Sequence, residues 1–152
     1  MLIWYHDAPH SKLFNIATMN WKLIFLLSLF GIAMAFARMF NLFGGNAENI
    51  IWFAILIFNA IVLAKSTTQK LFLHGFLICI INGIWGSAIH LALFDTFVAN
   101  NPDMVAKFKD LPINQYVLAC IMGPVIGIIS GAVEGVLTVI AGKFIKPSVA
   151  TT

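Results

Sequence analysis

Residues 116–144 read YVLACIMGPVIGIISGAVEGVLTVIAGKF, and this stretch decides the fold. It holds one acid, Glu134, and one lysine near its end; the other side chains are apolar, small or hydroxyl-bearing. A helix needs about 20 predominantly apolar residues to cross about 30 Å of bilayer hydrocarbon. The stretch is therefore long enough to span a membrane.

Three more apolar stretches precede this one, so we predict an all-α integral membrane four-helix bundle. The predicted spans cover residues 21–43, 50–64, 71–99 and 116–144. The second is short, and we expect it to borrow flanking residues or to lie in locally thinned bilayer. The amphipathic link at residues 104–115 is expected at the membrane surface. No connection is long enough to fold separately, so residues 1–152 are predicted to form a single transmembrane domain.

Composition supports lipid as the solvent of this chain. Of its 152 residues, 61% are hydrophobic and 10% are charged, whereas soluble domains are about half apolar and about a quarter charged. The nine Lys and Arg residues are scattered singly, so the net charge of +3 predicts no nucleic-acid partner. The two cysteines, Cys79 and Cys120, lie in apolar stretches, which predicts no disulfide framework and no CxxC site.

Basic residues predict that both termini lie on the cytoplasmic side. With the amino terminus inside, the inner face receives Lys12, Lys22, Lys65, Lys70, Lys143 and Lys146, and the outer face receives Arg38, Lys107 and Lys109. The inner excess satisfies the positive-inside rule. An alternative is signal-peptidase cleavage after Ala35-Phe36-Ala37, which would leave three spans. The long stretch before the first apolar core argues against cleavage.

Small residues recur every four positions in the last two predicted spans. They are Gly123, Gly127, Gly131 and Gly135 in the fourth span, and Gly75, Cys79, Gly83 and Ser87 in the third. Small side chains at this spacing let helix backbones approach closely in lipid, where apolar burial does not drive association. Two interpretations stay open: packing of the third span against the fourth, or an interface with a second copy or another protein.

A polar cluster is predicted inside the membrane around Glu134. A charge at the centre of a span costs at least about 2.5 kcal/mol, so this side chain should face protein or water. Counted from the inner ends of their spans, Asn82 is nearly level with Glu134, Ser130 lies one turn away, and Asn59 is closer to the inner surface. The cluster is either a proton-binding or cation-binding site, or a set of hydrogen bonds that join the helices.

Other polar residues suggest anchoring rather than catalysis. Arg38, at the outer end of the first span, is expected to reach water or to pair with Asp95. His74 and His90 are sixteen residues apart on one span, about 24 Å along a helix, so they cannot share a haem iron. No metal site, cofactor site, phosphate loop or nucleophile motif is found, so none is predicted.

The layout resembles the bacterial four-helix membrane proteins of domain of unknown function 4199. The resemblance rests on an initial hairpin of two spans, on FLHGFLICIINGIWGSAIHLALFDTFVANNPDMVAKF and on IMGPVIGIISGAVEGVLTVIAGKFIKP, and it covers residues 20–147. It implies a bacterial inner-membrane protein without assigned activity, and it transfers no catalytic residue. The connection before the last span is shorter here than in the family pattern.

Three functions follow from these observations, in order of preference. The first is a non-enzymatic membrane protein that associates with itself or serves as an accessory subunit of a larger membrane complex. The second is a small proton- or cation-coupled transporter or channel-like oligomer that uses Glu134. The third is a membrane enzyme acting on a lipid or a quinone.

Overall fold

The computed structural model describes residues 19–44 and 46–148, and this part of the chain is helical without strands. Its helices are α1 (Trp21–Met39), α2 (Ala47–Ser66), α3 (Leu71–Ala92), α4 (Phe94–Asn100), α5 (Pro102–Phe108) and α6 (Gln115–Phe144). Four of them, α1, α2, α3 and α6, are long and apolar enough to cross a membrane. The all-α prediction and the prediction of four apolar helices of membrane-spanning length are thus confirmed.

Helix ends differ from the predicted spans for local reasons. The first helix stops at Met39 rather than residue 43, and Asn41 follows it with a φ of 49°, a left-handed conformation that asparagine tolerates better than most residues. The second helix is longer than the stretch 50–64, because it takes flanking residues at both ends and reaches 20 residues.

The third predicted span, 71–99, is two helices rather than one. α3 ends at Ala92, Leu93 leaves the helical conformation, and the seven-residue α4 follows. The link predicted at 104–115 begins with another short helix, α5, which has Pro102 in its first turn, where proline's missing N–H is not needed. Apolar composition continues through this region, so hydropathy alone could not locate the break.

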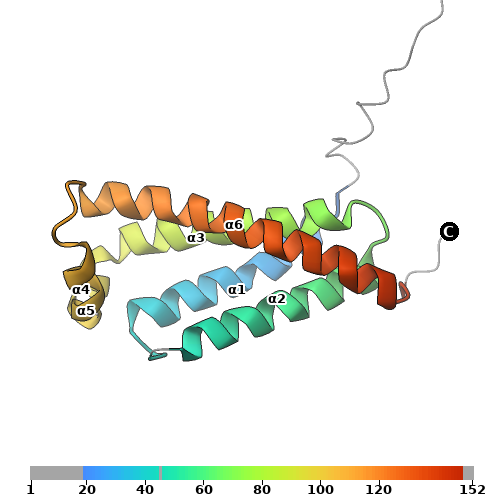
Figure 1. The fold of residues 1–152 in the computed structure, drawn as a ribbon, viewed down its shortest axis with the longest axis horizontal. Coiled ribbons are helices and arrows are strands. Elements are labelled where there is room, and N and C mark those ends of the chain that lie inside the picture. Colours follow the sequence, from blue (N-terminus) through green and yellow to red (C-terminus); the bar gives the residue numbers. More distant parts are fainter. Residues whose placement is uncertain (1–18, 45, 149–152) are drawn as a thin grey trace, which may run out of the picture.

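The helices α3 and α6 form a packed pair, and the hairpin of α1 and α2 lies against it (Figure 1). α3 and α6 share the most extensive contact in the molecule, α1 packs chiefly on α3, and α2 chiefly on α6. α4 and α5 lie at one end, which we call the α4–α5 end. The start of α1 and the end of α6 lie at the other, which we call the terminal end. There, the Ser148 N–H donates a hydrogen bond of 3.0 Å to the carbonyl oxygen of Lys65.

The packed core lies toward the terminal end. Ile24 and Leu27 of α1, Leu63 of α2 and Ile78 of α3 are buried together with Met19. Nearer the α4–α5 end, Met39 of α1 and Phe97 of α4 are also buried, but α1 and α2 diverge there from α3 and α6 (Figure 1). The half of the bundle at the terminal end is therefore more closely packed. The half at the α4–α5 end leaves space between the α1–α2 hairpin and the pair formed by α3 and α6.

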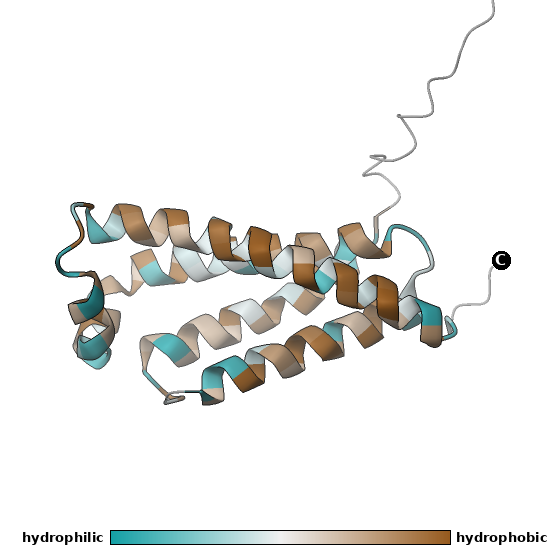
Figure 2. Cartoon of the chain, viewed as in Figure 1, coloured by the Kyte–Doolittle hydropathy of each residue, from teal (hydrophilic) through white to brown (hydrophobic). Residues whose placement is uncertain are grey.

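The outer surface of the bundle is apolar on every long helix (Figure 2). Leu26, Phe53, Ile84 and Ile129, one from each long helix, are each more than half exposed. Contiguous apolar surface of this extent is unfavourable in water and is the expected face toward lipid. The four apolar helices and their exposed faces together describe an integral membrane protein.

Candidate functional site

Two adjoining cavities occupy the α4–α5 end of the bundle. The larger, which we call the main cavity, has a volume of about 570 Å³ and lies between α1, α2, α3 and α6, with α4 and α5 across its end. The smaller, which we call the Arg38 chamber, has a volume of about 250 Å³ and is lined from the α1–α2 hairpin, from α5 and from Asn101, which lies between α4 and α5. Arg38, Glu48 and Met104 line both. The two spaces are therefore adjacent, with these three side chains at their common boundary.

Glycines of α6 pack directly on α3, and two of them, Gly123 and Gly127, border the main cavity. A Cβ added to Gly127 would lie 2.9 Å from the carbonyl oxygen of Cys79, and one added to Gly131 would lie 2.9 Å from that of Phe76. Gly123 faces Gly83 and Ser87 in the same way, and Gly135 faces Phe72. The row of small residues in α6 thus lies against α3, and the hydroxyl of Ser87 adds a 2.8 Å hydrogen bond to the Ala119 carbonyl. Of the two interpretations of this row, packing between the two helices is the one that the described residues show.

The predicted polar cluster is spread along the bundle rather than gathered at one level. Gly75 of α3 lies beside Glu134, since a Cβ on Gly75 would be 2.9 Å from the Glu134 carbonyl oxygen. Seven residues of α3, about 10 Å, separate that level from Asn82. The expectation that Asn82 and Glu134 are nearly level is wrong because α6 extends well past the start of α3, so counting from helix ends misplaces one against the other.

Asn82 and Ser130 border the main cavity, whereas Glu134 and Asn59 lie outside its lining. Asn82 points toward α1, where its Oδ1 would be 2.5 Å from a Cβ added to Gly31. The Ser130 hydroxyl donates a 2.7 Å hydrogen bond to the Ile126 carbonyl of its own helix. Cys79 lies beside both Ser130 and Glu134 and also borders the cavity.

The side-chain polar atoms of Glu134, Asn59 and Asn82 have no hydrogen-bond partner among the described residues. Glu134 and Asn59 are completely buried, and Asn82 is 8% exposed. The Thr138 hydroxyl, which lies next to Glu134, bonds the backbone carbonyl of that residue at 2.8 Å rather than its carboxyl group. In the described part of the chain these residues therefore do not form the interhelical hydrogen bonds that were one interpretation of the cluster.

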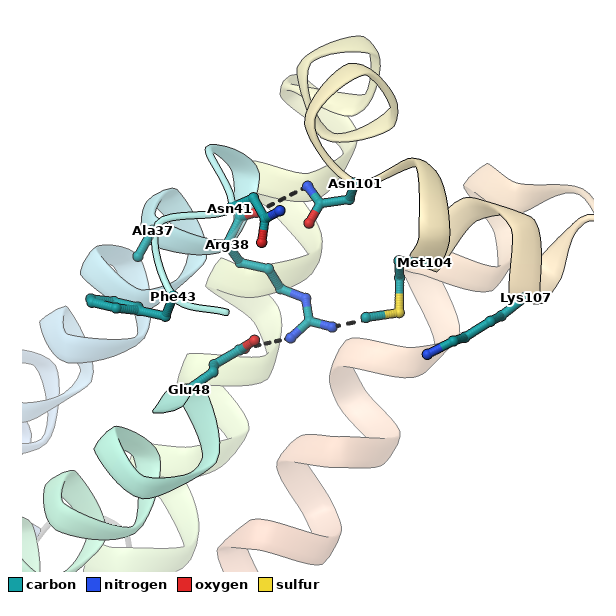
Figure 3. Close-up of a pocket in the computed structure, with 8 residues that line it drawn as sticks. All are labelled: Ala37, Arg38, Asn41, Phe43, Glu48, Asn101, Met104 and Lys107. Atoms are coloured by element: carbon teal, nitrogen blue, oxygen red, sulfur yellow. Dashed lines mark hydrogen bonds and ion pairs between the residues drawn. The ribbon is translucent and has the colours of Figure 1, made fainter. Parts of the chain in front are cut away.

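Arg38 pairs with Glu48 and not with Asp95. Its guanidinium Nη1 contacts the Glu48 carboxylate, and its Nη2 lies 4.0 Å from the sulfur of Met104 (Figure 3). The Nδ2 of Asn101 donates a 3.2 Å hydrogen bond to the Arg38 carbonyl and so ties the start of α5 to the end of α1. Arg38 and Glu48 lie on either side of the connection between α1 and α2, and the short helical hairpin that this connection closes is the sequence signal that could have identified the pair.

The two histidines within the described residues have different roles. His74 is buried, and its Nε2 accepts a 3.1 Å hydrogen bond from the Asn20 N–H. Its Nδ1 lies 3.0 Å from the Lys70 carbonyl, which can only accept, so Nδ1 carries the proton and the ring is neutral. His90 borders the main cavity, with its ring centroid 4.2 Å from that of Phe97. Sequence reasoning missed the bridge that His74 makes between α3 and the residue before α1.

A metal site is not formed by the residues that the structure describes, since no group of three His, Cys, Asp or Glu side chains comes together there. Comparison of the chain with protein-family models, with curated proteins and with solved structures finds no match. The layout resemblance to domain of unknown function 4199 stays a prediction. What the chain does has to be argued from the two cavities and their linings.

Proposed function

We propose that the protein is a non-enzymatic integral membrane protein that holds one lipid-like molecule in the main cavity. The observation that carries the proposal is a space of about 570 Å³ between membrane-spanning helices. Cavities that bind small molecules measure about 300–1,000 Å³ and combine apolar walls with a few polar groups. Here the walls are chiefly apolar side chains, such as Met34, Trp52, Leu56 and Met122, and the charged groups lie at one end.

The polar ends give the cavity a direction. Asn82, Cys79 and Ser130 border its deep end, and Arg38 and Glu48 border the end next to α5. A molecule with a hydrocarbon body and a charged head matches this distribution, since the charged side chains of the lining, Arg38 and Glu48, lie at one end only. The proposal keeps the preference for a non-enzymatic role, because the lining holds no nucleophile paired with a base.

Association with a second copy or with a partner subunit is compatible with this proposal, but it would have to use a surface other than the glycine row of α6. The glycine row of α6 lies against α3 and is not available to a second chain. The exposed apolar faces of α2 and α6 remain as surfaces toward lipid or a partner subunit. Copy number is therefore a result that the binding experiment below also reports.

We further propose that both termini lie in the cytoplasm of a bacterial cell, with the α4–α5 end on the opposite side of the inner membrane. The terminal end carries Lys22, Lys65, Lys70, Lys143 and Lys146, and the α4–α5 end carries Arg38, Lys107 and Lys109. This distribution follows the positive-inside rule. The bacterial origin rests on the layout resemblance alone.

The test of lipid binding is native mass spectrometry of the full chain released from nanodiscs of phosphatidylcholine. Gly86 borders the main cavity, and a Cβ added there meets nothing within 4 Å. Gly86→Phe should therefore fill the cavity without disturbing the helix backbone. Ile84→Phe, at a half-exposed position two residues earlier on the same helix, is the matched control.

We expect wild type and Ile84→Phe to retain one lipid per chain and Gly86→Phe to retain none. Equal retention by all three proteins would show that the bound lipid lies outside the cavity. The same spectra report whether the protein is released as a single chain, as an oligomer or with a partner.

A second candidate function, proton or cation transport, is favoured by one observation. Glu134 is completely buried in a membrane-spanning helix, and neither carboxyl oxygen has a hydrogen-bond partner among the described residues. Intramembrane acids are rare and often belong to ion or proton paths. Liposomes containing wild type should then pass protons under a pH gradient and those containing Glu134→Gln should not; equal flux would exclude this role for Glu134.

A further inference from the structure

The Arg38 chamber carries charge that the lipid-binding proposal does not use. It is lined by two cationic side chains, Arg38 and Lys107, and by one carboxylate, Glu48. The formal charge of these three groups is +1. Figure 3 shows Arg38 and Lys107 extending toward the chamber from opposite sides, from α1 and α5, with the Met104 side chain between them.

Donors in the chamber remain available for a ligand. A guanidinium has five N–H donors, and that of Arg38 uses Nη1 toward Glu48, while its Nη2 has the thioether of Met104, a weak acceptor, as its neighbour. Lys107 makes no hydrogen bond or ion pair with any residue between 19 and 148 that the structure describes. Two cationic groups therefore face one space with donors to spare.

Glu48 orients the arginine rather than neutralising the chamber. Its carboxylate holds one edge of the guanidinium, and this leaves the Nη2 edge directed toward Met104 and the chamber. A planar guanidinium held in one orientation is well suited to bind the oxygens of a phosphate through parallel hydrogen bonds. The acidic side chain thus prepares the site without competing for Lys107.

The chamber is also placed at the mouth of the main cavity. Arg38, Glu48 and Met104 line both spaces, so a molecule with its body in the main cavity would bring its head among these side chains. Met104 lies at the junction and offers a flexible apolar surface. The arrangement combines an apolar cavity of about 570 Å³ with a cationic chamber of about 250 Å³.

We infer that the molecule held by this protein is an anionic phospholipid, with its acyl portion in the main cavity and its phosphate headgroup bound by Arg38 and Lys107 in the Arg38 chamber. This inference rests on the lipid-binding function proposed above and adds the class of headgroup. Charge complementarity decides the occupant, since a choline headgroup would bring its own cation against Arg38 and Lys107 and a glycerol headgroup would not.

The experiment compares lipid retention in nanodiscs that contain equal amounts of phosphatidylglycerol and phosphatidylcholine. The full chain is released into the gas phase, and the ratio of the two lipids on the protein is measured. We expect wild type to retain phosphatidylglycerol in preference by about tenfold, because the cation of a choline headgroup would be repelled by Arg38 and Lys107. Lys107→Gln and Arg38→Gln should each bring the ratio close to one.

Lys109→Gln is the matched control, because Lys109 lies two residues along the chain and does not line the chamber. It removes the same charge from the same end of the molecule and should leave the tenfold preference intact. Lys107 is exposed and unpaired, so Lys107→Gln is expected to fold even if Arg38→Gln, which breaks the pair with Glu48, does not.

Three results would overturn the inference. Equal retention of both lipids by wild type would leave the lipid-binding function standing and remove the headgroup assignment. If Lys109→Gln also lost the preference for phosphatidylglycerol, that preference would be due to the general surface charge of this end of the protein rather than to the Arg38 chamber. Binding of inorganic phosphate to wild type in phosphatidylcholine nanodiscs, with no lipid preference, would show a site for the free anion. Retention of neither lipid would instead refute the proposed function itself.

Discussion

Two glycines of α3, three residues apart, are expected to respond oppositely to the same substitution. A Cβ on Gly83 would collide with the carbonyl oxygen of Gly123, whereas a Cβ on Gly86 meets open space. Gly83→Ala should lower the free energy of unfolding by about 1–3 kcal/mol through overpacking. Gly86→Ala should raise it by up to about 1 kcal/mol, because alanine favours the helix over glycine.

Unfolding by denaturing detergent, followed by circular dichroism, measures both effects. Equal changes in the two variants would mean that α3 and α6 do not approach as closely as the structure shows.

The separation of Glu134 from Asn82 predicts independent energetics. Sites further apart than about 7–10 Å without shared partners usually add within about 0.5 kcal/mol. A double-mutant cycle of Glu134→Gln and Asn82→Leu should therefore give a coupling free energy below about 0.5 kcal/mol in the same unfolding experiment. A coupling of 1 kcal/mol or more would restore the single polar cluster expected from the sequence.

His74 is expected to contribute to stability through its hydrogen bond with the Asn20 N–H rather than through charge. His74→Leu removes the acceptor for the Asn20 N–H, and leaving that part-buried donor unpaired costs about 1–3 kcal/mol, whereas the Lys70 carbonyl keeps its hydrogen bond from the backbone N–H of residue 74. Hydrogen exchange should accelerate at the first amides of α1. The lipid-facing change Ile84→Leu serves as the control and should leave that exchange unchanged; equal protection in both variants would contradict the bridge.

At the level of helices, hydropathy predicted the existence and approximate position of each long helix, because these depend on the composition of one segment alone. The four long helices were found because each must be apolar over about 20 residues to lie in hydrocarbon. The ends were less accurate where polar and apolar residues mix, as at Leu93, where a backbone turn interrupts an apolar run.

Hydropathy could not predict the register of one helix against another, or which side chains pair between helices. The offset of α6 against α3 depends on which glycines meet which carbonyls, and this register moved Glu134 away from the level of Asn82. The partner of Arg38 depended on how the hairpin between α1 and α2 closes, which selected Glu48 over Asp95. The glycine row itself was recognisable, but its partner surface was not.

For the whole molecule, orientation in the membrane is the main expectation to test. In a background with Cys79 and Cys120 replaced by serine, Asp110→Cys places a thiol in the exposed loop before α6, and Gln69→Cys places one in the exposed loop between α2 and α3. A membrane-impermeant maleimide applied to intact cells should label the first and not the second. The reverse pattern would invert the proposed topology.

The closely packed end of the bundle and the end that holds the cavity are expected to differ in mobility. Because the buried side chains around Leu63 hold the helices together near the terminal end, we expect the hairpin of α1 and α2 to move relative to α3 and α6 chiefly at the α4–α5 end. Spin labels at Leu42 and Tyr116 should therefore report a wider distance distribution than labels at Lys65 and Lys143, and cavity filling by Gly86→Phe should alter only the first pair. Lateral pressure from the bilayer would then set how far the hairpin separates from α3 and α6. Membrane composition would therefore regulate how often the main cavity is occupied, without any change in the ligand.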